Sequence, residues 1–218
     1  MDLTKLSVSL HDCQLCQLSA GRTHVVFGTG NPQASIMFVG EAPGFYEDRE
    51  GVPFVGAAGK LLTELLQSIG LERSDIYIAN VIKCRPPNNR DPLPEEIDTC
   101  KPFLLQQIAL IQPKLVCTLG NFATQTLLGR KVGITRVRGQ MIELEHFVVF
   151  PLLHPAAALH QGNLQVPLQE DFQKLKAVLE EMSNTPTLPK TPSPPSLSTP
   201  KASTKDTPTE PPTQMSLF

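Results

Sequence analysis

The chain lacks several features that would assign it directly to a common class of protein. Its 218 residues carry 19 lysines and arginines against 21 aspartates and glutamates, so a net charge of −2 gives no general attraction to nucleic acid. No apolar run reaches membrane-spanning length, and the first ten residues lack the apolar core and cleavage site of a signal peptide. A glycine-rich phosphate loop with a lysine is also absent. We therefore expect a cytoplasmic protein without membrane contact, whose nucleic-acid surface, if present, is a local patch.

Two short segments are locally basic and are candidate nucleic-acid surfaces. The first contains Lys83, Arg85 and Arg90. The second contains Arg130, Lys131, Arg136 and Arg138. An ordinary solvated surface explains either segment equally well.

Proline is concentrated at one end of the chain. Nine of the 21 prolines follow Ser183, in a segment rich in threonine, serine and lysine. Such a segment cannot bury enough apolar surface to offset the entropy lost on ordering. We predict a folded domain over residues 1–182 and a disordered tail over residues 183–218.

Apolar runs and helical patterns alternate along the first 182 residues. Strands are expected over 35–39, 76–82, 115–119 and 148–153. Helices are expected over 57–69, 94–111, 121–129, where Asn121 is the expected cap, and 168–182. This alternation predicts an α/β fold with a mostly parallel sheet covered on both faces. Ligands of such sheets bind beyond the carboxyl ends of the strands, where the most unusual segments of this chain also lie.

The five cysteines indicate metal or catalytic thiols rather than disulfides, because no secretion signal accompanies them. Cys13 and Cys16 form a close pair, Cys84 ends the second strand, and Cys100 lies in the following helix. Four thiolates can close a tetrahedral site, and both zinc and iron–sulfur clusters accept such a set. Separate buried thiols are the alternative. Cys117 lies within an apolar strand and is expected to be a small core residue.

Three further motifs, taken with the cysteines, resemble those of the family 4 uracil-DNA glycosylases. The first is Gly40-Glu41-Ala42-Pro43-Gly44, followed by Glu47-Asp48 and Pro53-Phe54-Val55-Gly56. The second is Asn80 with Cys84-Arg85-Pro86-Pro87-Asn88-Asn89-Arg90, and the third is His154-Pro155-Ala156-Ala157. The resemblance implies a three-layer α/β/α sandwich with a four-stranded parallel sheet. It also implies a 4Fe–4S cluster on Cys13, Cys16, Cys84 and Cys100 that does no redox work in the reaction.

Cleavage of an N-glycosidic bond requires a donor that stabilises negative charge on the departing base. His154 is our candidate, because a neutral imidazole at a strand end can donate to uracil O2; a structural histidine is the alternative. Glu41 is the candidate for orienting water or supporting the sugar cation. The better-known family 1 enzymes have an aspartate next to this position. Here Ala42 stands in its place, so no catalytic aspartate is carried over.

Base recognition has its own candidate residues. Phe54 is expected to stack on the flipped base from an exposed loop, because Gly51, Pro53 and Gly56 flank it. The amide of Asn80 can pair with uracil O4 and N3–H, a pattern that rejects cytosine.

The resemblance implies that Glu47 blocks the 5-methyl group of thymine. Further candidates come from the residues themselves. Backbone N–H groups around Ala42, Pro43 and Gly44 are candidates for binding uracil O2 or a phosphate, and Asn89 for positioning water or phosphate. Leu159 is a candidate wedge for the gap that the flipped base leaves.

The last five residues are the apolar part of the tail: Gln214, Met215, Ser216, Leu217 and Phe218. They resemble the peptides that bind the bacterial sliding clamp. A flexible linker with a terminal hydrophobic anchor is suited to tethering. A chance pentapeptide is the alternative.

The motifs predict a monomeric, nucleoid-associated enzyme that flips uracil out of DNA and hydrolyses its glycosidic bond to leave an abasic site. One alternative is a non-catalytic iron–sulfur DNA-binding module of the same fold, associated with a polymerase. The other is a zinc-stabilised nucleotide-binding α/β protein.

Overall fold

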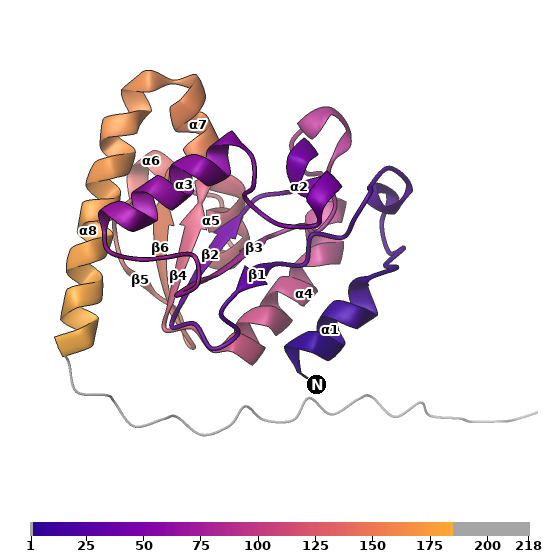
Figure 1. Ribbon diagram of the computed structural model, residues 1–218, viewed down its shortest axis with the longest axis horizontal. Coiled ribbons are helices and arrows are strands. Elements are labelled where there is room, and N and C mark those ends of the chain that lie inside the picture. Colours follow the sequence, from indigo (N-terminus) through magenta and orange to yellow (C-terminus); the bar gives the residue numbers. More distant parts are fainter. Residues whose placement is uncertain (1, 185–218) are drawn as a thin grey trace, which may run out of the picture. The chain divides into compact units, whose positions relative to one another are not determined.

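Four short apolar runs form the centre of the sheet: β2 (Ile36–Gly40), β3 (Tyr77–Asn80), β4 (Leu115–Leu119) and β6 (Val148–Leu152). They run parallel in the order β3-β2-β4-β6 (Figure 1). The computed structural model describes residues 2–184, so the predicted clamp-binding motif lies outside the described residues. The prediction of a four-stranded parallel sheet is confirmed for the centre of the sheet.

Two strands of two residues each extend the sheet at its edges. β1 (Thr29–Gly30) pairs antiparallel with β3, and β5 (Ile142–Glu143) pairs antiparallel with β6. The sheet therefore has six strands rather than four. Two residues are too few for an alternating pattern to show in a sequence.

The helices lie on both faces of this sheet. They are α1 (Leu3–Leu10), α2 (Phe45–Glu50), α3 (Ala57–Ser68), α4 (Pro94–Ile111), α5 (Gly120–Leu128), α6 (Ile134–Val137), α7 (Pro155–His160) and α8 (Gln165–Asn184). Three 3-10 turns span 17–20, 87–89 and 162–164. None of the described helices is long and apolar enough to cross a membrane.

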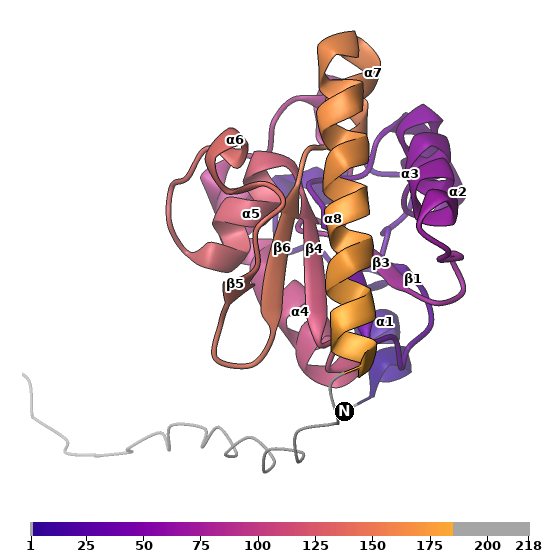
Figure 2. The same cartoon turned by 90° about the vertical axis from the view of Figure 1, so that its left-hand side faces the viewer.

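Side chains alternate between two apolar layers along each central strand. Phe38 of β2 packs with α3 and α8 on one face, where its ring stacks on that of Phe172. Its neighbours Met37 and Val39 face the other way, toward Leu104 of α4. Figure 2 shows α8 lying along the first face of the sheet. The prediction of a three-layer α/β/α fold is thus confirmed.

Several boundaries differ from those predicted. The last helix begins three residues earlier than expected and runs to Asn184, two residues beyond the predicted domain end. Asn121 does not cap α5, because Leu119 occupies the cap position and the Asn121 side chain instead accepts the backbone N–H of Ile134 at 2.8 Å. Cys117 is fully buried, as predicted.

Candidate active site

The carboxyl ends of neighbouring strands bring three predicted residues together. Gly40 ends β2 opposite Asn80 of β3 in the parallel register. A Cβ atom on Gly40 would lie 2.4 Å from Asn80 Oδ1 and 2.6 Å from Phe54 Cζ. The ring of Phe54 in turn stacks beside that of His154, with centroids 5.8 Å apart and planes at 29°. We call Gly40, Phe54, Asn80 and His154 the base site.

Asn80 carries an unused hydrogen-bond acceptor. The residue is 1% exposed, and its Oδ1 is the one buried side-chain polar atom within residues 2–184 that has no partner. A buried polar atom without a partner costs on the order of 1–3 kcal/mol. An acceptor held in this way at a strand end fits a ligand that brings its own N–H group.

His154 is held in one tautomer. It caps α7, and its Nδ1 accepts the backbone N–H of Ala156 at 3.1 Å. Burial lowers the pKa of His154 to about 4, and the nearby Glu47 carboxylate only partly opposes this effect. The imidazole is therefore neutral at physiological pH, with its proton on Nε2. This nitrogen is a hydrogen-bond donor.

The Phe54 side chain is buried in a core cluster with Leu62 and Leu66 of α3, so the prediction that it is exposed was wrong, although Val52 in the same loop is exposed. Phe54 is only 7% exposed. Its backbone, with a φ of 55°, lies in the left-handed region. Arg73 donates from Nη1 to the Phe54 carbonyl at 3.1 Å and from Nη2 to the Pro53 carbonyl at 3.0 Å. On the other side, a Cβ on Gly59 of α3 would lie 1.8 Å from the Phe54 carbonyl oxygen. Arg73 is a positioning residue that no sequence motif indicated.

Glu47 fixes the same loop. Its Oε1 accepts the backbone N–H groups of Val55 at 3.1 Å and Gly56 at 3.0 Å. Two such bonds hold the carboxylate against the loop, so its visible role in the structure is to position Phe54. Glu47 belongs to α2, which follows the Gly40–Gly44 turn directly.

Glu41 is the titratable group of the site. Burial, assisted by the Asp91 carboxylate, raises the pKa of Glu41 to about 7. Its backbone carbonyl accepts the N–H of Ile82 at 3.1 Å, so the residue is fixed beside the end of β3. A carboxyl group poised near neutrality is suited to general acid–base work.

The remaining predicted site residues lie around this centre. Pro43 is buried and Ala42 is half-buried in the turn after β2. Asn89 is exposed, and its Oδ1 accepts Arg85 Nε at 2.7 Å, so the structure does not bring it into the base site. Leu159 lies on α7 with 44% of its surface exposed.

The four predicted cysteine ligands gather beside the β3 end. Cys84 interacts electrostatically with Cys16 and Cys100, and Cys100 interacts with Cys13 as well. Burial raises the pKa of Cys84 to about 11, while the guanidinium of Arg22, 3.6 Å from its Sγ, acts in the opposite direction. In the described part of the chain, no three His, Cys, Asp or Glu side chains have the geometry of a single-ion site.

Only two of the three residues of the first basic patch reach the surface. Lys83 is 1% exposed, and its Nζ donates to the Asn80 carbonyl at 2.7 Å and to Gln107 Oε1 at 2.6 Å. Arg90 forms a two-bond ion pair with Glu96, while its side chain stays 37% exposed, and Arg85 is half-buried. Lys83 therefore does not belong to a basic surface, whereas Arg85 and Arg90 still reach it. A lysine after a strand can satisfy the buried carbonyls around it as well as project into solvent.

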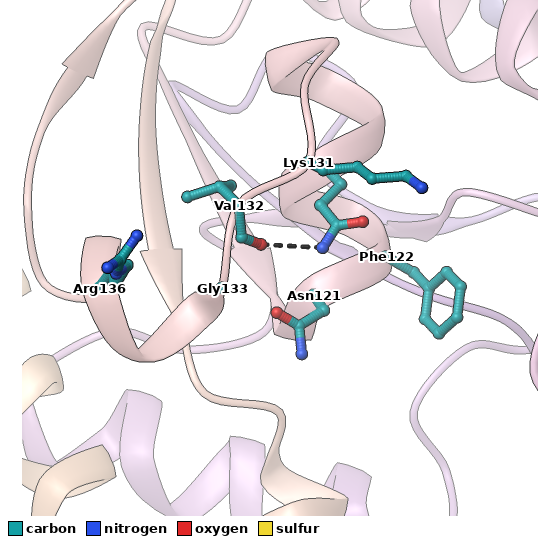
Figure 3. Close-up of a pocket in the computed structure, with 7 residues that line it drawn as sticks. Asn121, Phe122, Lys131, Val132, Gly133 and Arg136 are labelled. Carbon is teal, nitrogen blue, oxygen red and sulfur yellow. Dashed lines mark hydrogen bonds between the residues drawn. The ribbon is translucent and has the colours of Figure 1, made fainter.

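The second basic patch is partly retained. Arg138 is paired with Asp171 at 2.6 Å, whereas Lys131 and Arg136 line an open pocket of about 540 Å³ between α5 and α6 (Figure 3). The bond from Gln125 Nε2 to the Val132 carbonyl, 2.8 Å long, ties the turn between these helices. The pocket holds none of the base-site residues.

A mostly parallel sheet covered by helices on both faces, with polar groups gathered at the carboxyl ends of its strands, defines a doubly wound α/β protein. The model of the uracil DNA glycosylase superfamily matches residues 27–181, and the chain belongs to this superfamily. A type-4 uracil-DNA glycosylase of Sulfurisphaera tokodaii is 50% identical, covering 80% of this chain and 83% of the relative. One of Archaeoglobus fulgidus is 48% identical, covering 75% and 86%.

A different relative bears on the alternative of a polymerase-associated module. A DNA polymerase of Bacillus phage SP01 is 34% identical over 70% of this chain, which corresponds to 17% of that protein. The domain thus also occurs as a small part of a larger protein.

Proposed function

We propose that this protein hydrolyses the bond between uracil and deoxyribose in DNA, as the names of its type-4 relatives indicate. The observation that carries the proposal is the unpartnered Oδ1 of Asn80 beside the Phe54 ring. Uracil N3–H donates to this oxygen, and the amide nitrogen donates to O4. Cytosine has an acceptor at N3 and donors at its exocyclic nitrogen, so the same amide rejects it.

His154 supplies the stabilisation of the leaving group. As the glycosidic bond breaks, negative charge develops on uracil O2, and the Nε2–H of the neutral ring donates to it. The Ala156 N–H holds this tautomer without a second protonation. The base is proposed to stack on the Phe54 ring, which requires this buried ring to become accessible when the base enters.

Glu41 acts on the other side of the broken bond. In its carboxylate form it orients a water molecule toward the sugar cation and accepts a proton as the water adds. The raised pKa makes this group a stronger base than an exposed glutamate. Glu47 contributes by fixing the Phe54 loop. The family resemblance also makes Glu47 the candidate for the side chain that limits the 5-position of the base.

We also propose that Cys13, Cys16, Cys84 and Cys100 hold a 4Fe–4S cluster. The support for the cluster is the family resemblance, together with the electrostatic interactions of Cys84 and Cys100 with each other and with Cys13 and Cys16, which place the four thiols in one region. The cluster would supply cross-links between the N-terminal segment, the end of β3 and α4.

The five terminal residues, Gln214 to Phe218, are proposed to bind the sliding clamp. Their support is the sequence resemblance alone, since they lie outside the described residues. Tethering would raise the local concentration of the enzyme at newly replicated DNA.

The deciding experiment is single-turnover cleavage of a uracil-containing oligonucleotide, with a thymine-containing strand as the control. Protein purified without oxygen is expected to release uracil and to leave thymine in place. Protein with an intact cluster that releases no uracil would favour the non-catalytic DNA-binding module.

A further inference from the structure

An exposed aromatic pair takes no part in the chemistry described so far. Phe45 and Tyr46 begin α2, and they are 45% and 57% exposed. Their rings contact each other edge to face, with centroids 5.4 Å apart and planes at 82°. A single exposed apolar residue needs no explanation, but two adjacent aromatic rings in a defined arrangement form a surface that a partner can use.

Two arginines surround this pair. The guanidinium carbon of Arg85 lies 5.1 Å from the centroid of Phe45, and that of Arg49 lies 5.8 Å away. Both distances are within the range of cation–π contacts. Glu47, on the same helix, does not neutralise them directly because the backbone of the Phe54 loop engages its carboxylate. Glu50, also on α2, is exposed at the end of the helix.

The pair adjoins both segments that bound the base site. Tyr46 Cδ2 lies 3.6 Å from the position of a Cβ on Gly56, in the Phe54 loop. Phe45 contacts Arg85, which lies in the loop between β3 and α4. Figure 1 shows α2 beside the loop that leads from β3 to α4. A DNA strand whose uracil occupies the base site therefore passes close to these rings.

We propose that Phe45 and Tyr46 form a stacking surface for an unpaired base next to the flipped uracil. Arg49 and Arg85 contribute positive charge for the adjoining phosphates. The inference rests on the proposed function, because the uracil in the base site places the strand. An aromatic ring can stack only on a base that is not already stacked within a duplex. The chain consequently favours uracil in single-stranded or locally unpaired DNA over uracil in a closed duplex.

The test compares the full chain with the double variant Phe45→Ala/Tyr46→Ala. Affinity is measured by fluorescence anisotropy for a single strand carrying a non-cleavable uracil nucleotide, and for the same strand in a duplex. The double variant is expected to lose about 5- to 100-fold in affinity for the single strand and less for the duplex. The exchange variant Phe45→Tyr/Tyr46→Phe should keep the affinity. Leu105→Ala, which removes another exposed apolar side chain on α4, should leave it unchanged.

Uracil release at saturating protein separates this inference from the proposed function. If wild-type protein releases uracil and the double variant binds the single strand equally well, the inference is wrong and the glycosylase stands. An equal loss for single strand and duplex also overturns it. Pair-dependent binding of the single strand without uracil release supports the stacking surface and overturns the glycosylase. Sedimentation velocity tests whether the pair serves another purpose. If wild-type protein is a dimer and the double variant is a monomer, the pair forms an interface between copies and the stacking proposal is wrong.

Discussion

His154 and Asn80 offer complementary hydrogen-bonding groups to a bound base: His154 offers a donor and Asn80 an acceptor. The histidine has a proton to give on Nε2 because its other nitrogen is occupied by Ala156, and the amide has an oxygen with nothing to accept. Each group would gain a hydrogen-bond partner from a ring that has both a carbonyl oxygen and an imide N–H. Uracil has both groups.

Replacing His154 by alanine tests the donor directly. Loss of one preorganised donor to a developing oxyanion costs on the order of 10²- to 10³-fold in rate. We expect His154→Ala to lose this much in single-turnover cleavage while binding uracil-containing DNA with little change. His154→Gln retains an N–H group and should recover part of the rate. Wild-type cleavage by the alanine variant would contradict the assignment.

Glu41 sets the expected pH dependence. The pKa of His154 is lowered to about 4, so this residue stays neutral from pH 5 to 9. The pKa of Glu41 is raised to about 7, so the carboxylate fraction, and with it the cleavage rate, should increase through pH 7. Glu41→Gln should be slower and should flatten this part of the profile. A variant profile that still rises through pH 7 would assign the titration to another group.

The same shift has a consequence for stability. Because the folded-state pKa of Glu41 lies above its usual value of 4.5, the folded protein binds more protons than the unfolded chain between these two values. The contribution of Glu41 to the free energy of unfolding should therefore fall as pH rises from about 4.5 to about 7, whereas the contribution of His154, whose folded-state pKa is lowered to about 4, rises over much of the same range. In urea denaturation, the difference in free energy of unfolding between wild type and Glu41→Gln should therefore change in favour of the variant as pH rises through this window.

At the scale of elements, α2 and the Phe54 loop behave as one unit. Glu47 joins them through two backbone N–H groups, and Arg73 holds the loop from the far side. The left-handed backbone of Phe54 is kept in place by these bonds together with the close approach of Gly59. The position of the stacking ring therefore depends on residues outside the base site.

Glu47 variants should show this dependence. Glu47→Ala leaves the Val55 and Gly56 N–H groups without acceptors, so we expect a rise in KM of about tenfold or more with faster hydrogen exchange over residues 53–56. Glu47→Gln keeps an acceptor oxygen and should restore most of the exchange protection. Unchanged exchange in Glu47→Ala would show that Arg73 alone fixes the loop.

The strength of each local pattern decided which elements the sequence could predict. The residue bounds of β4 and α4 match those expected, because a continuous apolar run and a proline followed by two glutamates mark them clearly. The six-residue helices α2 and α7 were missed, since fewer than two turns show no period. The burial of Phe54 and Lys83 depends on Arg73 and Gln107, partners distant in sequence.

For the whole molecule, the proposed cluster would connect segments that are far apart along the chain. We expect Cys100→Ser to lose the absorbance near 400 nm that iron–sulfur proteins show, and to destabilise the packing of α1 on α4. Cys117→Ser, a matched thiol in the core, should keep the absorbance. Equal absorbance in wild type and Cys100→Ser would remove this residue from the ligand set.

Removing the tail tests its separate role. Deletion of residues 214–218 should leave cleavage of naked DNA unchanged, because the base site lies wholly within residues 40–154. Binding of the sliding clamp in a pull-down should be lost. A truncated chain that still binds the clamp would place the contact elsewhere.

Gly40 limits how the specificity of this enzyme can evolve. Every other amino acid is larger, and even a methyl group there would overlap Asn80 and Phe54. Substitutions of Gly40 can only reduce the space for a base. Selection for activity on bulkier lesions therefore cannot act through substitutions of Gly40. Variants with a wider substrate range should instead arise where a side chain can be shortened, at Phe54, at Asn80, or in the α2 helix that holds the loop.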